Sequence, residues 1–138
     1  MTKNPYDTDL DKNAANHQPL SPLSFLKRAA EVYPETIAVM HGELRRNYAD
    51  FYARCSQLAS ALSKRGIGLG DTVSVIAPNT PEMLELHYAV PMVGAVLNTM
   101  NIRLDGPLIG FMFDHADTKM LMVDREFASL GKEALANA

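Results

Sequence analysis

An apolar stripe with helical spacing between residues 48 and 62 is the clearest pattern in the chain. Its members recur every three or four residues, and they are Tyr48, Phe51, Tyr52, Cys55, Leu58, Ala59 and Leu62. This spacing predicts a helix with one buried face. Asn47 is a suitable N-cap, Asp50 lies in the favourable first turn, and Gly66 can adopt the left-handed conformation that ends a helix.

The segment before this stripe predicts another helix and a small hairpin. Ser21 can cap a helix that begins at Pro22, continues with apolar residues at helical spacing and ends near Tyr33, before Pro34. A short strand is expected at residues 36–40, and residues 41–43 can turn the chain into a second short strand at about residues 44–46, which would form a small β-hairpin.

Beyond residue 66 the pattern alternates between strands and helices. Short apolar runs predict strands at residues 72–77, 95–98 and 119–123, and helical patterns are expected at residues 81–93, 107–115 and 125–138. Strands separated by helices pair in parallel through helical crossovers, and apolar runs suit strands covered on both faces. The predicted fold is therefore α/β: a partial layered domain with about three parallel strands plus a small hairpin, flanked by helices.

Two features predict that this domain is incomplete. Three parallel strands are few for a doubly wound domain, and the chain stops within a helical pattern. We therefore expect residues 21–138 to be an incomplete N-terminal α/β subdomain. Residues 1–20 are polar and rich in Asn, Asp and Pro, so they are expected to form a flexible N-terminal arm.

Composition narrows the class of protein. The 138 residues are 47% hydrophobic and 21% charged, which is typical of a globular protein with a core. A net charge of −3 with scattered basic residues argues against a nucleic-acid partner. One cysteine, a polar N-terminus and a longest apolar run of nine residues (89–97) favour a cytoplasmic protein without disulfide, signal peptide or transmembrane segment.

Most motifs that carry chemistry are missing from the sequence. Gly66, Gly68 and Gly70 follow a helix and precede a strand, which is the reverse of a dinucleotide-binding turn, so they are interpreted as a helix end and a tight turn. The four histidines are too widely spaced for a zinc site, and Cys55 belongs to the apolar stripe, so it is expected in the core. His87 could face a pocket, but we interpret it as a hydrogen-bonded, partly buried residue. His115 could be an acid–base group, but we interpret it as a residue that complements the end of its helix.

Two polar segments follow predicted strands, at residues 78–81 and 98–105. In parallel sheets, ligands bind beyond the carboxyl ends of the strands, so either segment could contact a ligand. A structural interpretation stands beside this one, because Thr80 and Asp105 are suitable N-caps and asparagine tolerates unusual turn geometry.

The order of these segments resembles the AMP-forming acyl-CoA synthetase family over about residues 21–130. The segment Asn-Tyr-Ala-Asp-Phe at residues 47–51 is similar to its first core motif, commonly Thr-Tyr-Ala-Glu-Leu. Residues 66–73 and 78–82 match the segments that follow, and the second core motif ends in Asn-Thr-Met-Asn-Ile-Arg-Leu at residues 98–104. That form is similar to fatty acyl or related carboxylate ligases, although most relatives have Thr in place of Ile102.

The resemblance implies an N-terminal fragment of a ligase that is catalytically incomplete. The family uses MgATP to turn a carboxylic acid into an acyl-adenylate, which then reacts with CoA. The phosphate-binding loop and the catalytic lysine domain come later in the family than the matched stretch, so no catalytic residue or metal ligand is expected here. The expected partner is the remainder of the synthetase chain. The full-length enzyme is expected to use ATP, Mg and CoA, and a homodimer is its expected assembly.

Two arginines are candidates for contact with a CoA phosphate. Arg125 directly follows the last predicted strand, and Arg103 follows the preceding one. The alternative is that both are ordinary surface arginines. Two other functions are kept open: a module that binds CoA or an acyl nucleotide without turnover, and one subunit of a split synthetase.

Overall fold

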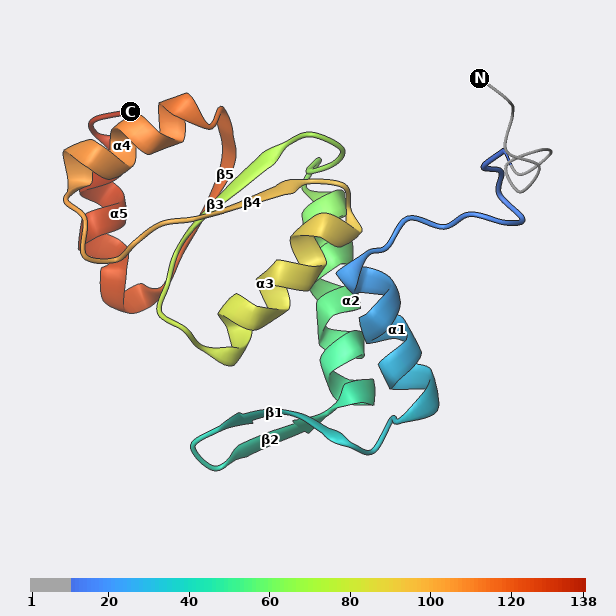
Figure 1. Cartoon of the computed structure of the whole chain (residues 1–138). Helices are drawn as coiled ribbons and strands as arrows, with labels where there is room; N and C mark the ends of the chain where they lie inside the picture. Colours follow the sequence, from blue (N-terminus) through green and yellow to red (C-terminus); the bar gives the residue numbers. More distant parts are fainter. Residues whose placement is uncertain (1–10) are drawn as a thin grey trace, which may run out of the picture.

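The computed structural model describes residues 11–138, which form five α-helices, five strands and one short 3₁₀ helix (Figure 1). In chain order the elements are α1 (Pro22–Val32), β1 (Ile37–His41), β2 (Leu44–Asn47), α2 (Tyr48–Lys64), β3 (Thr72–Ile76), α3 (Pro81–Met92), β4 (Val96–Thr99), α4 (Gly106–His115), β5 (Thr118–Val123), η2 (Arg125–Phe127) and α5 (Ala128–Leu135). The predicted α/β class, with three parallel strands and a hairpin, is confirmed.

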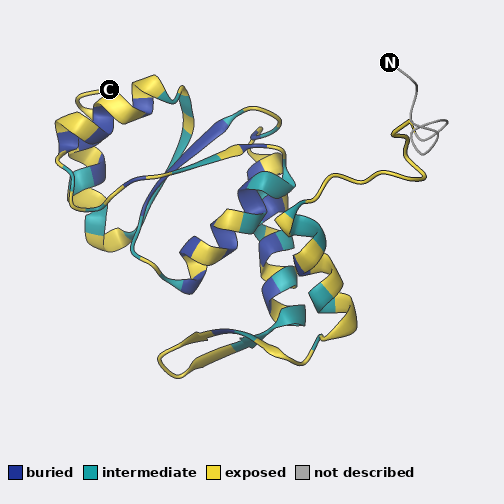
Figure 2. Cartoon of the chain, in the orientation of Figure 1, coloured by how far each residue is buried: buried dark blue, intermediate teal, exposed yellow. Residues whose placement is uncertain are grey.

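The three-stranded sheet is parallel, and its order is β4-β3-β5. All five residues of the central strand β3 are buried, because helices cover both faces of the sheet (Figure 2). Val73 and Val75 pack on the side of α2 and α3, whereas Ile76 packs on the side of α4 and α5. The strands therefore have apolar side chains on both faces, as the continuous apolar runs predicted.

The antiparallel hairpin β1–β2 and helix α1 pack against α2 and α3, away from the parallel sheet. Their shared core contains Leu26 of α1, Val39 of β1 and Phe51 and Cys55 of α2. The ring of Phe51 meets Tyr88 of α3 edge to face, with ring centres 5.4 Å apart. The apolar stripe of α2 therefore joins the N-terminal elements to the sheet.

The helices begin at the predicted N-cap residues, although one of these residues makes no side-chain hydrogen bond to its helix. The side chains of Ser21, Asn47 and Asp105 accept backbone N–H hydrogen bonds at the starts of α1, α2 and α4. Thr80 is the N-cap of α3, but its side chain makes no such hydrogen bond. After α2, Gly66 has φ +81°, the left-handed conformation that was expected to end the helix.

The C-terminal segment differs from its prediction. Instead of one helix over residues 125–138, the 3₁₀ helix η2 leads into α5, which ends at Leu135. Asp124 causes the tighter start, because its carboxylate caps the backbone N–H of Glu126 at 2.9 Å. Gly110 of α4 lets α5 approach closely, since a Cβ there would lie 2.8 Å from the carbonyl oxygen of Ala134.

Residues 11–20 are exposed, and the hydrogen bonds of residues 11–17 join only one another. The first ten residues of the expected arm lie outside the described residues, so the division of the chain at residue 20 stays a prediction. Within residues 11–138, no helix is both long enough and apolar enough to cross a membrane.

Candidate functional site at the carboxyl edge of the sheet

The carboxyl ends of β3, β4 and β5 lie at one edge because the strands are parallel. The chain leaves β3 toward α3 on one face of the sheet, and it leaves β5 toward η2 and α5 on the other face. Such a divergence between neighbouring strands is a topological switch point, where α/β proteins bind ligands. The edge between β3 and β5 is therefore the candidate site.

Arg125 borders this switch point, whereas Arg103 does not. Arg125 is the first residue of η2, directly after β5, and it is exposed. Arg103 is also exposed, but it follows β4 on the other side of β3. Within the described part of the chain neither arginine takes part in an ion pair. The topology thus places the two candidates beyond the two outer strands, with the central strand between them.

The polar residues of 98–105 have structural partners. Asn98 donates a hydrogen bond from Nδ2 to Oγ of Ser74, inside the sheet, at 3.1 Å. Asn101 accepts a hydrogen bond from the backbone N–H of Arg103 at 3.0 Å, and Asp105 accepts one from Leu108 at 3.0 Å. For these three side chains the structural interpretation is confirmed, since each stabilises a turn, a helix end or the sheet.

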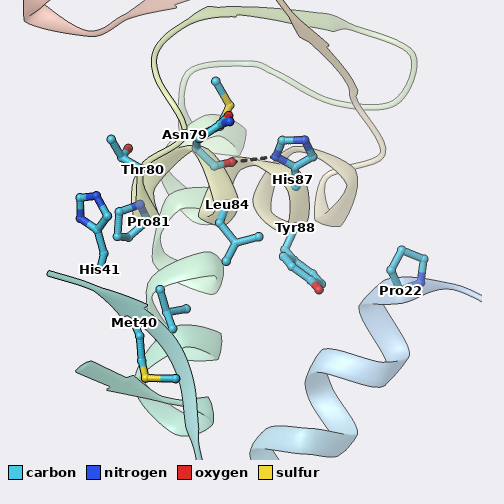
Figure 3. A pocket seen from close by; sticks show the side chains of 11 residues that line it. Pro22, Met40, His41, Asn79, Thr80, Pro81, Leu84, His87 and Tyr88 are labelled. Carbon is cyan, nitrogen blue, oxygen red and sulfur yellow. Dashed lines mark hydrogen bonds between the residues drawn. The ribbon is translucent and has the colours of Figure 1, made fainter. Parts of the chain in front are cut away.

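The other polar segment, after β3, lines a groove of about 600 Å³ (Figure 3). The groove lies between hairpin strand β1 and the first turns of α3, with Pro22 of α1 at its margin. Its lining is mostly apolar and includes Met40, Leu84 and Tyr88, and its polar side chains come from Asn79, Thr80 and the two histidines His41 and His87.

The structure confirms that His87 is hydrogen-bonded, but it does not confirm that the side chain is partly buried. Its Nδ1 lies 2.8 Å from the carbonyl oxygen of Met83, one turn earlier in α3, so Nδ1 donates a hydrogen bond to that oxygen. The side chain is exposed at the groove rather than partly buried. His115 is exposed in the last turn of α4 and stacks on Phe111, with ring centres 5.8 Å apart, so its place at a helix end is confirmed.

An ion-pair cluster around the buried carboxylate of Glu85 was not predicted from the sequence. Glu85 of α3 is 4% exposed, and its carboxylate accepts hydrogen bonds from Arg46 of β2 at 2.5 Å and from Arg54 of α2 at 2.5 and 3.1 Å. The hydrogen bond with Glu85 raises the pKa of Arg54. One signal was present: Glu85 stands among buried apolar residues of α3, where a charge requires a partner.

Glu82 extends this cluster toward solvent. It lies one turn before Glu85 in α3, and its carboxylate is 3.9 Å from Arg46. A hydrogen bond from its own backbone N–H, at the start of the helix, lowers the pKa of Glu82, and nearby Arg46 acts in the same direction. The cluster therefore joins β2, α2 and α3 through two arginines and two carboxylates.

The thiol of Cys55 is not available as a nucleophile. Cys55 is fully buried, and this burial raises the pKa of its thiol to about 12, so the nucleophilic thiolate is scarce at neutral pH. Among residues 11–138, no three His, Cys, Asp or Glu side chains are grouped so that they could hold a metal ion.

A family model and the sequences of related proteins match most of this chain. The family model described as AMP-binding enzyme matches residues 26–138. Acetate–CoA ligase CCL3 of Humulus lupulus is 53% identical over 127 residues, which cover 92% of this chain and 22% of that protein. Acetate/butyrate–CoA ligase AAE7, peroxisomal, of Arabidopsis thaliana is 49% identical over 127 residues, with the same coverage. The chain thus spans about a fifth of the length of these relatives.

Solved structures share the fold. The N-terminal domain of FACL13 from Mycobacterium tuberculosis superposes with a TM-score of 0.79 at 28% identity, covering 84% of this chain and 30% of that domain. A fatty acyl CoA synthetase of the same organism has a TM-score of 0.80 at 28% identity, with 84% and 24% covered. The described fold therefore corresponds to part of a larger domain in these proteins.

Proposed function

The chain belongs to the AMP-binding enzyme family, and we propose that it is the N-terminal part of a ligase that joins a fatty or related carboxylic acid to CoA. A fold alone does not identify a reaction. The observation that carries the proposal is 53% identity over 127 residues to an acetate–CoA ligase. Butyrate and benzoate ligases are among the other relatives, so the activation of a carboxylic acid is their common feature.

In the proposed parent enzyme, a carboxylate oxygen attacks the α-phosphorus of MgATP and releases pyrophosphate. The CoA thiol then attacks the carbonyl carbon of the acyl-adenylate and releases AMP, and the thiol gives up its proton. These steps depend on positioning and on cations near the phosphates. We assign them to the remainder of the parent chain, and we assign this segment a supporting role at the carboxyl edge of its sheet.

A chimaeric enzyme tests this assignment. The matching 127-residue segment of the hop acetate–CoA ligase would be replaced with the corresponding residues of this chain, and release of AMP would be measured with acetate, ATP and CoA. We expect turnover that requires both acetate and CoA, within about tenfold of the unmodified hop enzyme, because volume-conserving exchanges keep a core folded. A folded chimaera that releases no AMP would contradict the proposal.

Arg125 is the residue of this chain that we propose contacts a phosphate of CoA, with Arg103 as the second candidate. The support is its exposed position beside the β3/β5 switch point. A charge-assisted hydrogen bond to phosphate contributes about 1.5–3 kcal/mol, so Arg125→Ala in the chimaera should raise the KM for CoA roughly tenfold or more. The KM for acetate should change little.

Two matched variants make this measurement specific. Arg103→Ala tests the second candidate, beyond the other outer strand. Arg65→Ala removes an exposed arginine at the C-cap of α2, in the connection that enters β3 at the opposite edge of the sheet, and it should leave both KM values unchanged. If Arg65→Ala and Arg125→Ala changed the KM for CoA equally, the proposed contact between Arg125 and a CoA phosphate would be contradicted.

Location and assembly are also proposals. The composition favours the cytoplasm, whereas several plant relatives are peroxisomal by name. A fluorescent fusion of the parent protein, imaged with a peroxisomal marker, distinguishes the two compartments. Sedimentation of the purified chimaera tests the expected homodimer.

A further inference from the structure

The exposed arm before α1 contains a turn that is held together by its own side chains. The backbone N–H groups of Ala15 and Asn16 donate to Oδ1 of Asn13, at 2.9 and 3.2 Å. In return, the N–H of Asn13 donates to Oδ1 of Asn16 at 2.9 Å, and the N–H of His17 donates to the carbonyl oxygen of Asn13 at 2.9 Å. Two side chains that cap each other's backbone form the reciprocal pattern of a capping box, so residues 13–17 adopt a defined turn.

This turn stands apart from the packed unit that α1 to α5 form. Residues 11–20 are exposed, and Figure 1 shows them leading away from α1, clear of the sheet and of the hairpin. Leu20 is 87% exposed, although it directly precedes Ser21, the N-cap of α1. Within the described residues, the arm thus presents an ordered turn and an apolar side chain to solvent, and both are available for a contact.

The match with the hop ligase includes the arm. The matched segment has 127 residues, which leaves eleven of the 138 outside, so residues 12–20 lie inside the match wherever it begins. The AMP-binding family model, in contrast, begins at residue 26. Terminal segments without a contact are the parts of a domain that tolerate change most readily. The arm is therefore shared with this relative, and the family-wide domain does not account for it.

The self-capped turn favours docking. An arm loses conformational entropy when it binds, and a segment that already has its bound conformation loses less. The mutual caps of Asn13 and Asn16 restrict the turn, and the ring of Pro19 restricts the backbone directly before Leu20. A short preformed segment of this kind fits a surface that receives one apolar side chain and exchanges hydrogen bonds with amide groups.

We propose that residues 12–20 dock on a surface of the remainder of the parent ligase and bury Leu20 there. This inference rests on the proposed function, which supplies the identity of the parent chain. The matched segment is 22% of the hop ligase, so most of that protein is available to provide the surface. A second copy of this chain is the competing partner.

Amide hydrogen exchange in the 138-residue chain gives the first test. The N–H groups of Ala15, Asn16 and His17 should exchange within about tenfold of the rate of an unstructured peptide, because a single exposed turn opens readily. If they were protected by about 100-fold or more at low micromolar concentration, the arm would already be docked on the packed unit and the proposal would be overturned. Protection that appeared only at higher protein concentration would assign the arm to a second copy and would also overturn it.

The chimaera with the hop ligase gives the second test, because its exchanged segment carries residues 12–20. There the same three amides should become at least about 100-fold more protected than in the isolated chain, at any protein concentration. An active chimaera whose arm stays unprotected would overturn this inference and leave the proposed function intact. A folded chimaera whose arm is protected, but which releases no AMP, would support the docking and contradict the proposed function.

The variant Leu20→Ala tests the contact itself. In the chimaera it should lower the protection of the arm at least about tenfold, because burial of a leucine side chain strengthens a contact by more than that factor. Leu69→Ala is the matched control, since Leu69 is 92% exposed in the connection between α2 and β3, and it should leave the protection of the arm unchanged. If the two variants changed this protection equally, Leu20 would not be buried on docking and the proposal would be overturned.

Discussion

Glu85 shows how a single buried charge can determine the position of three elements. Its carboxylate accepts hydrogen bonds from Arg46 of β2 and Arg54 of α2, which lie 39 and 31 residues away in the sequence. A lone acidic residue on an apolar helix face indicates that a partner exists. It does not identify the partner, because only the folded chain brings such distant residues together.

Replacing Glu85 with Gln should lower the free energy of unfolding by about 2 kcal/mol. Breaking a buried pair typically costs about 3–5 kcal/mol, but the side chain of Arg54 is 42% exposed and can be partly rehydrated. Urea unfolding of the isolated chain measures the change. Glu82→Gln is the matched control, because that carboxylate is 61% exposed and 3.9 Å from Arg46, and it should cost less than about 0.5 kcal/mol. If the two variants lost equal free energies of unfolding, the burial of Glu85 would not be what makes its ion pairs stabilising.

Cys55 should make the stability of the fold depend on alkaline pH. Burial raises the pKa of its thiol from 9.0 to about 12, so the unfolded chain loses this proton first. The free energy of unfolding therefore falls as pH rises from about 9 toward 12, and this thiol accounts for about 1.4 kcal/mol at pH 10. Urea unfolding at pH 8 and pH 10 measures the change.

The variant Cys55→Ala isolates this contribution, because lysines and tyrosines titrate equally in both proteins. Its loss of stability between pH 8 and pH 10 should be smaller than that of the unmodified chain by about 1.4 kcal/mol. An identical pH dependence of the two proteins would show that the thiol ionises normally in the fold. The core position of Cys55 was predictable from the helical stripe, because burial there follows from spacing alone.

At the level of elements, the sequence predicted most helices and strands to within one or two residues. Spacing of apolar residues and cap residues are local signals, and these determined α1, α2 and α4. The order of strands in the sheet and the place of the hairpin depend on packing between distant segments, so neither could be read from the chain. The C-terminal helix was predicted too long: a 3₁₀ turn capped by Asp124 precedes it, and the helix itself spans only Ala128–Leu135.

Asp105 and Thr80 form a natural comparison of two helix starts. Both follow strands and precede helices with Pro in the first turn, but only Asp105 caps its helix with a side-chain hydrogen bond. Asp105→Ala should therefore lower the free energy of unfolding by about 1 kcal/mol, and Thr80→Ala by less than about 0.5 kcal/mol. Thermal or urea unfolding distinguishes them, and a larger loss from Thr80→Ala would contradict the geometry of the two caps.

At the scale of the whole molecule, α1 is the first element among residues 11–138 that contributes side chains to the core. Residues 11–20 are exposed, whereas Leu26 of α1 is 3% exposed and packs with Val39, Phe51 and Cys55. Deleting the predicted arm, residues 1–20, should change the free energy of unfolding by less than about 0.5 kcal/mol, since the part of it that the structure describes, residues 11–20, is exposed and adds little stability. Urea unfolding of the shortened chain measures this, with Ser21 retained as the N-cap of α1.

Leu26→Ala is the control that shows the assay can detect a loss at this end of the chain. Removing a buried leucine side chain should cost about 2–4 kcal/mol. If deletion of residues 1–20 cost as much as Leu26→Ala, the arm would contribute contacts to the packed unit, and the domain would have to begin before residue 21. If only Leu26→Ala were destabilising, α1 would be the first element that the sheet and the hairpin require.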